Sequence, residues 1–571
     1  MIQYEKWESG NDVHWYREDP LLVRYAKRYL SDASFRFAEP FFQKAGAWAA
    51  GPMDRRAAYT DREGAPKLIR YNRKGEEINS IWYNEGYLQT IREGYGTGVV
   101  ALRYNQQVPE PLSFMTNSVL FYLLSQAETG FTCPVILTQS VAFVLEKFGS
   151  MQQKQDYLLR LGSMDPQQLI QGGTFLTEIQ GGSDVGATKT IAVKHGDHYL
   201  LSGEKWFASN CDAEISLALA RCNNRPGTKG LGLFLIPRSL PDGTPNRISI
   251  RRLKDKLGVR AVPSGELILQ EAVGYLIGKE EHGFKYMAEA LNVSRLGTAL
   301  GGLAIARRAF WEAAIYSANR QAFEQSVLQF PLVRETMADL ITEIEAGWAL
   351  LAQTIMAFDE VHTFQRATKD RHTLLRLLLS LGKYRASELG VSAAKAALEL
   401  HGGNGYIEEY VTARLLRDAV VNPIWEGTAN IQCLEILKIL QKDGLGPYTQ
   451  DLRNTLQQIQ TDPLTPWRES LLAEISLLEE EFKRLLVADP STQQACSKHL
   501  ADHLYNLFAA VHLLEEAQFD IRTANDYRRF LVFKRWFQQK LETPGQSRFS
   551  IPFVLSDEMF NALVRFAPFS M

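Results

Sequence analysis

One block of alternating residues interrupts an otherwise helical sequence, and this limits the folds open to the chain. Between about residues 170 and 282, apolar side chains recur at every second position, a period typical of strands. The clearest signals are a hairpin turn at His195-Gly196-Asp197 and the alternations Ile215, Leu217, Leu219 and Leu231, Leu233, Leu235. Because long helical segments lie on both sides, the sequence predicts an α+β, mainly α protein and argues against a doubly wound nucleotide-binding domain.

Changes in periodicity divide the chain into four predicted domains. They are an N-terminal helical domain (1–168), a middle β-domain (169–282), a helical bundle domain (283–440) and a C-terminal helical extension (441–571). The glycine-rich segment 444–447 is the predicted linker before the extension. The charged segment from about 49 to 79 is predicted to be an extended loop.

Composition and charge narrow the expected class of protein. A formal net charge of −2 over 571 residues gives no strong attraction to nucleic acid or anionic membranes. The five cysteines are scattered without a C-x-x-C pair, which fits a reducing compartment and predicts neither structural zinc nor disulfides. The polar N-terminus does not resemble a signal peptide, and no run approaches 18 apolar residues. We therefore expect a cytoplasmic protein with no metal site and no integral membrane contact.

A lone carboxylate follows a glycine-rich turn between residues 400 and 432. This carboxylate, Glu426, precedes Gly427 and Thr428. The stretch resembles the C-terminal signature of the acyl-CoA dehydrogenase family, flavoenzymes that desaturate fatty acyl thioesters. The resemblance implies that Glu426 is the base that removes the substrate α-proton, while a hydride passes from the β-carbon to N5 of FAD. It also implies that Gly427 contacts the substrate and Thr428 the cofactor.

Two segments of the β-domain resemble the flavin-facing parts of the same family. In the string T-E-x-x-x-G-S-D, Thr177 is expected at the flavin pyrimidine edge, and Gly182 allows a close backbone approach. Ser183 is expected near either the cofactor phosphates or the substrate thioester. Further on, Phe207 replaces the usual tryptophan beside the flavin, and Ser209 supplies the hydroxyl near N5.

Further matches imply contacts with the flavin of a neighbouring subunit, and therefore a homodimer or homotetramer. Arg320 and Phe323, in a predicted helix, match an Arg-x-x-Phe pattern whose arginine binds the flavin pyrophosphate. The glycine that usually follows is Glu324 in this chain. The turn expected to receive the adenosine half of that flavin contains Glu399 (where a glutamine is usual), Gly402 and Gly403.

The resemblance also suggests partners. Arg295 matches an arginine near the acyl-CoA substrate, although a helix-packing salt bridge explains it equally well. FAD is expected between the middle domain and the bundle. Electron-transferring flavoprotein is the family's usual electron acceptor, while the acyl chain length has no local sequence signal.

The extension separates this chain from the shorter dehydrogenases and resembles that of two long subgroups, the very-long-chain dehydrogenases and the AidB-like proteins. The strings GGSDV, KWF-x-S and N-x-IWEG-x-x-N, and residues 71–78, resemble more closely the AidB-like subgroup, whose members are weak dehydrogenases that bind DNA. Residues 441–571 contain 14 Lys+Arg and 17 Asp+Glu, so nucleic acid is an unlikely partner. The one basic candidate, residues 527–540, has aromatic residues at helical spacing, which favours a helix packed against the core. The sequence thus predicts an acyl-CoA dehydrogenase. The alternatives are an AidB-like, DNA-associated stress-response flavoprotein and a flavin-dependent oxidase.

Overall fold

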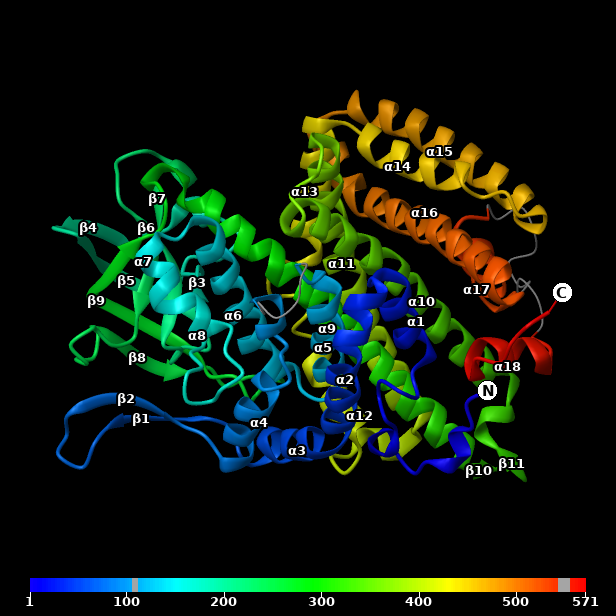
Figure 1. The fold of residues 1–571 in the computed structure, drawn as a ribbon, viewed down its shortest axis with the longest axis horizontal. Coiled ribbons are helices and arrows are strands. Elements are labelled where there is room, and N and C mark those ends of the chain that lie inside the picture. Colours follow the sequence, from blue (N-terminus) through cyan, green and yellow to red (C-terminus); the bar gives the residue numbers. More distant parts are fainter. Residues whose placement is uncertain (105–110, 543–554, 571) are drawn as a thin grey trace. The chain divides into compact units, whose positions relative to one another are not determined.

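The computed structural model of the protein describes residues 1–104, 111–542 and 555–570. These residues form two compact units, which we call the barrel unit (36–297) and the bundle unit (1–35 with 298–571). Helix α9 (Gly283–Asn319) starts in the barrel unit and ends in the bundle unit (Figure 1). The four domain boundaries expected from the sequence describe a finer division and stay predictions.

The described residues of the barrel unit contain a seven-stranded sheet. Its strands are β3 (Gly172–Phe175), β4 (Ile191–His195), β5 (His198–Ser209), β6 (Ile215–Arg221), β7 (Leu231–Pro237), β8 (Ile248–Leu253) and β9 (Ser264–Leu276). The strand order is β3-β6-β4-β5-β9-β7, with β8 on β9, and β6 also pairs with β7. The predicted β-structure in the middle of the chain is confirmed, and the last pairing closes the sheet into a barrel.

Strand β6 shows how the barrel is packed on both faces. Ala218 and Ala220 join the cluster inside the barrel, while Leu217 and Leu219 pack with residues of helix α6 (Thr129–Phe148). Small residues on one face and leucines on the other follow from the two-residue period of a strand. Helix α6 is long and apolar enough to span a membrane, but 94% of its apolar window is buried inside the structure, as in a core helix.

Other helices and a hairpin complete the barrel unit. Helix α2 (Asp32–Trp48) enters it from the bundle unit; the main elements that follow are α3 (Asp54–Arg62), β1 (Lys67–Tyr71), β2 (Glu77–Trp82), α4 (Glu85–Tyr95) and α5 (Phe114–Ser125). The prediction of an extended loop over 49–79 is therefore wrong. Helix α3 buries Asp54, Ala57, Thr60 and Asp61 on one side, and because three of these four residues are polar, its sequence carries little apolar periodicity.

Long helices make up the bundle unit, as predicted. Beside the end of α9 they are α1 (Pro20–Tyr29), α10 (Pro331–Phe358), α11 (Lys369–Leu400), α12 (Val411–Ala419), α13 (Ala429–Asp443), α14 (Gly446–Gln457), α15 (Thr465–Leu486), α16 (Pro490–Ala524), α17 (Arg528–Lys540) and α18 (Asp557–Arg565). Helix α13 ends at the predicted linker, where Gly444 has a φ of +78°, a conformation that favours glycine. Within the extension, α14, α16, α17 and α18 pack on α10 or α11 of the same unit, while α15 packs on α14 and α16.

Candidate functional site

The loop that carries Thr177, Gly182 and Ser183 leaves strand β3 of the barrel unit and is exposed from Ile179 to Asp184. Its conformation depends on a close approach at Gly182, where an added Cβ would lie 2.6 Å from the Thr177 hydroxyl. The Thr177 carbonyl accepts a hydrogen bond of 2.9 Å from the Trp206 amide of β5. The structure therefore brings the loop against the strand that carries Phe207 and Ser209.

Glu178 anchors this loop, a role that the sequence analysis missed. One carboxylate oxygen accepts from the Thr190 amide, the Thr190 hydroxyl and the buried Lys205 ammonium (2.8 Å); the other accepts from the Lys189 amide and the Gln180 side chain. Burial opposes ionisation of Glu178, but Lys205 and the hydrogen bonds outweigh it and lower its pKa to about 2. Along β5 the buried side chains alternate with less buried ones, and Lys205 occupies one of the buried positions. A lysine in the sequence does not by itself reveal that its position is buried.

Strand β5 places an aromatic ring and a hydroxyl close to one another at its end. Phe207 is 58% exposed, and the Lys254 ammonium lies over its ring, 4.8 Å from the centroid. Ser209 lies directly opposite Ser264 of β9, and their hydroxyl oxygens are 3.0 Å apart. An exposed aromatic face beside small residues and a hydroxyl suits the binding of a planar, hydrogen-bonding ring.

Glu426 lies in a left-handed turn between α12 and α13 of the bundle unit, with a φ of +58°. Such a conformation is uncommon for residues other than glycine, so the surrounding contacts must hold it. The Gln432 side chain donates to the Glu426 carbonyl at 2.9 Å, and the buried Lys383 ammonium donates to the Gly427 carbonyl at 2.5 Å. Thr428 is exposed and begins α13 without capping it through its side chain.

Buried polar atoms in the same turn have no protein partner among the described residues. They are both amide atoms of Asn422, the indole nitrogen of Trp425 and the amide oxygen of Gln432. Asn422 is fully buried. Because buried polar groups in native proteins are nearly always hydrogen-bonded, a cluster of unpaired ones points to a missing ligand or water. This feature fits a turn that binds a polar cofactor or substrate.

The other bundle residues predicted to bind cofactor lie near the end of α9. Arg320 directly follows this helix, and Phe323 occupies the tip of a hairpin formed by β10 (Gln321–Ala322) and β11 (Gln325–Ser326). The predicted helix at this place is therefore wrong. Phe323 and Glu324 have φ values of +49° and +69°, which a tight two-residue hairpin requires, and this explains why a glycine is usual at the second position.

The glycine-rich turn lies beside the same helix end. Asn404, next to Gly402 and Gly403, donates to the Tyr316 hydroxyl of α9 at 3.0 Å. A Cβ added at either glycine would meet nothing within 4 Å, so this backbone is open to a ligand. Glu399 is exposed and paired with Lys395 at 2.6 Å. Arg295 lies half-buried on the part of α9 that belongs to the barrel unit.

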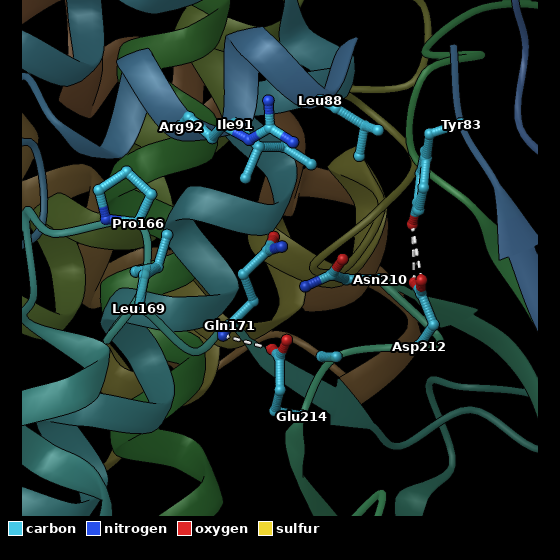
Figure 2. A pocket seen from close by; sticks show the side chains of 11 residues that line it. Tyr83, Leu88, Ile91, Arg92, Pro166, Leu169, Gln171, Asn210, Asp212 and Glu214 are labelled. Carbon is cyan, nitrogen blue, oxygen red and sulfur yellow. Dashed lines mark hydrogen bonds between the residues drawn. The ribbon is translucent and has the colours of Figure 1, made fainter. Parts of the chain in front are cut away.

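A cavity of about 260 Å³ lies elsewhere in the barrel unit, between α4 and the ends of strands (Figure 2). Its polar side chains form hydrogen bonds within the protein. The Tyr83 hydroxyl donates to both carboxylate oxygens of Asp212, and the Glu214 carboxylate accepts from the backbone N–H of Gln171. Burial raises the pKa of Asp212. The cavity is lined by Asn210 but by none of the predicted site residues, so it is separate from the predicted cofactor contacts of this unit.

Comparisons with known proteins identify the family of the chain. Family models match residues 281–441 (acyl-CoA dehydrogenase, C-terminal domain), 173–272 (acyl-CoA dehydrogenase, middle domain) and 6–165 (adaptive response protein AidB, N-terminal domain). The putative acyl-CoA dehydrogenase AidB of Escherichia coli is 32% identical over 66% of this chain and 69% of its own length.

Two solved structures extend the similarity across the chain. ACDH-11 of Caenorhabditis elegans, crystallised with C11-CoA, is 26% identical, with a TM-score of 0.84 over 93% of this chain and 91% of that one. An acyl-CoA dehydrogenase of Bacillus anthracis complexed with FAD shares the fold, at 19% identity and a TM-score of 0.68 over 95% and 88%.

Proposed function

Because this chain belongs to the acyl-CoA dehydrogenase family and is an oxidoreductase of that family, we propose that Glu426 removes the α-proton of an acyl-CoA thioester. The observation that carries the proposal is the turn around Glu426. Its left-handed backbone is held by Lys383 and Gln432 while neighbouring buried polar atoms lack protein partners. A carboxylate fixed in such a turn meets the first requirement of a general base, which is position.

Residues of this turn also suit the charge that develops during the reaction. Loss of the α-proton places negative charge on the thioester carbonyl, which needs a hydrogen-bond donor. The backbone N–H of Glu426 is the proposed donor. Gly427 lets the turn form, because its φ of +97° favours glycine and an added Cβ would lie 2.6 Å from the Gln432 amide nitrogen. The apolar surroundings of a bound acyl chain would raise the pKa of Glu426 and make it a stronger base.

FAD is the cofactor, and when bound it accepts the hydride that leaves the substrate β-carbon. The proposed contacts in the barrel unit are Thr177, Gly182, Ser183, Phe207 and Ser209. The structure supports them with the close approach at Gly182 and the exposed ring of Phe207. Ser183 is proposed to contact either the cofactor phosphates or the substrate thioester. Thr428 is the proposed cofactor contact in the bundle unit.

Arg320, Phe323, Glu399, Gly402 and Gly403 are proposed to bind the flavin of a second subunit in a homodimer or homotetramer. Phe323 is 89% exposed at the tip of a hairpin, so its ring is open to contact by a second subunit. Glu399 accepts hydrogen bonds but cannot donate to phosphate, so ribose hydroxyls are its proposed partners. Electron-transferring flavoprotein is the proposed electron acceptor.

The extension argues against the DNA-associated alternative. Its basic candidate segment forms α17, and Arg528, Arg529 and Arg535 are buried there in ion pairs with carboxylates of the same unit. Buried, neutralised arginines cannot bind phosphates of a duplex. The segment is therefore used for packing, as its aromatic spacing predicted.

An anaerobic titration of the yellow protein with acyl-CoAs of different chain length tests the proposed function. We expect the flavin absorption band to bleach with at least one of them. Oxygen uptake after bleaching would favour the oxidase alternative. A flavin that no thioester reduces, together with retardation of DNA at physiological salt, would favour the AidB-like alternative.

A further inference from the structure

A lysine in the barrel unit lies two hydrogen bonds from the proposed flavin contact Ser209. The Lys256 ammonium donates to the Val259 and Val262 carbonyls, at 2.8 and 2.6 Å, and to the Ser264 hydroxyl oxygen at 3.2 Å. Val259 has a φ of +47°, so the backbone curls around the ammonium. The loop thus fixes the position of the charge beside Ser264, which is buried.

Opposite positions in neighbouring strands bring the two serines together. Ser209 is the last residue of β5, and Ser264, the first of β9, is its antiparallel partner. Side chains at such positions lie on the same face of the sheet. Their oxygens are 3.0 Å apart, and from geometry alone either hydroxyl can be the donor.

The charge on Lys256 decides which hydroxyl donates. An ammonium group can only donate, so the Ser264 oxygen must act as acceptor toward Lys256. The Ser264 oxygen keeps a second lone pair, but its own proton is repelled by the ammonium, and Ser209 is its one other side-chain partner among the described residues. Ser264 therefore donates to the Ser209 oxygen. Ser209 makes no other side-chain hydrogen bond among the described residues, which leaves it one proton and one lone pair for a ligand.

We propose that Lys256 is a positioning residue that acts through Ser264 to keep the Ser209 proton available to the flavin. This inference rests on the proposed place of Ser209 beside N5. A hydroxyl with one proton and one lone pair to spare can donate to N5 of the oxidised ring and accept from N5–H of the reduced ring. Without the ammonium, Ser264 can accept the Ser209 proton, and the oxidised flavin loses its donor.

We call the two hydrogen bonds from Lys256 through Ser264 to Ser209 the relay. If it acts as proposed, removing Ser264 should restore part of the activity that is lost when Lys256 is replaced. Lys256→Met should lower the rate of flavin reduction about five- to tenfold, the effect of one lost neutral hydrogen bond, and shift the absorption band of bound oxidised FAD. Ser264→Ala leaves the Ser209 proton unclaimed and should have a smaller effect. The double variant should return to the values of Ser264→Ala alone, because the group that captures the proton is then absent.

The experiment compares wild type, the two single variants and the double variant by visible spectroscopy, FAD dissociation constant and anaerobic stopped-flow reduction with the acyl-CoA that bleaches wild type fastest. Lys194→Met, on exposed β4, controls for loss of a positive charge in the same unit. A Lys256→Met spectrum equal to that of wild type would overturn the relay. So would a double variant as impaired as Lys256→Met, which would indicate collapse of the 259–262 backbone. Because the spectral comparison needs no substrate, it tests the relay even if no acyl-CoA bleaches the flavin.

Discussion

Two regions of the bundle unit bury polar groups in opposite ways. Around α17, each of two buried charges is matched by an opposite charge beside it: the Arg528 guanidinium lies 2.5 Å from Glu345, and Arg529 lies between Glu345 and Asp520. One Arg529 nitrogen makes no hydrogen bond among the described residues, but its charge is still paired. In the turn before α13, by contrast, Asn422 is fully buried with both amide atoms unpaired. A buried charge beside an opposite charge needs no ligand, whereas a buried amide without a protein partner needs a ligand or water to form its hydrogen bonds. The comparison assigns a structural role to the first region and a ligand-binding role to the second.

The largest stability effect should come from breaking the matched region. Glu345→Leu leaves two buried guanidinium groups without their shared carboxylate, and we expect a loss of about 3–5 kcal/mol in the free energy of unfolding. Urea unfolding followed by circular dichroism measures it. A loss below about 1 kcal/mol would mean that solvent reaches these arginines, and the comparison between the two regions would fail.

Acidification should weaken the same region through Glu516. Burial opposes its ionisation, but Arg24, Arg28 and Arg529 together lower its pKa to about 2. A carboxyl with a lowered folded-state pKa stabilises the protein above its unfolded value, near 4.5, and that stability is lost as the pH falls toward 2. Between pH 6 and pH 3, wild type should lose about 2 kcal/mol more than Glu516→Gln. If wild type and Glu516→Gln lost the same stability, a carboxyl other than Glu516 would be responsible for the acid sensitivity.

The unmatched region should respond in the opposite direction. Asn422→Leu removes a buried amide that has no protein partner, so the cofactor-free protein should gain about 1 kcal/mol in unfolding free energy. Because the turn loses polar groups that a ligand would satisfy, flavin reduction by acyl-CoA should become slower. A less stable cofactor-free variant would show that Asn422 serves the fold and would remove the contrast.

The smallest effect should come from an exposed ion pair. Lys395 and Glu399 are close on α11 but largely solvated. Lys395→Ala should change the unfolding free energy by less than about 0.5 kcal/mol. A larger loss would give Glu399 a structural role in place of the proposed ribose contact.

Regular periodicity made most of the fold predictable. The alternation at Leu217 and Leu219 gave the sheet, and the aromatic spacing of 527–540 gave the buried helix α17, because both repeat the geometry of their element. Helix α3 and the hairpin at Phe323 were missed, since the buried face of the first is mostly polar and the second lacks the glycine that marks such turns.

The candidate site was only partly open to prediction from the sequence. Glu426 follows from a motif, and the structure adds the contacts that hold its turn. Lys205 and Lys383 are buried and Lys256 is half-buried, and the three form hydrogen bonds to residues 27, 44 and 8 positions away, respectively. The sequence around such a lysine does not differ from that around an exposed lysine, so these hydrogen bonds are seen only once the fold is known.

The most direct test of the central claim is the rate at which an acyl-CoA bleaches the flavin of Glu426→Gln in anaerobic stopped flow. Glu481→Gln, exposed on α15, is the matched control. If Glu426 is the base, its amide variant should keep bound FAD and fold normally, yet bleach at least about a hundredfold more slowly than wild type. Bleaching of Glu426→Gln at the wild-type rate would show that another group removes the α-proton.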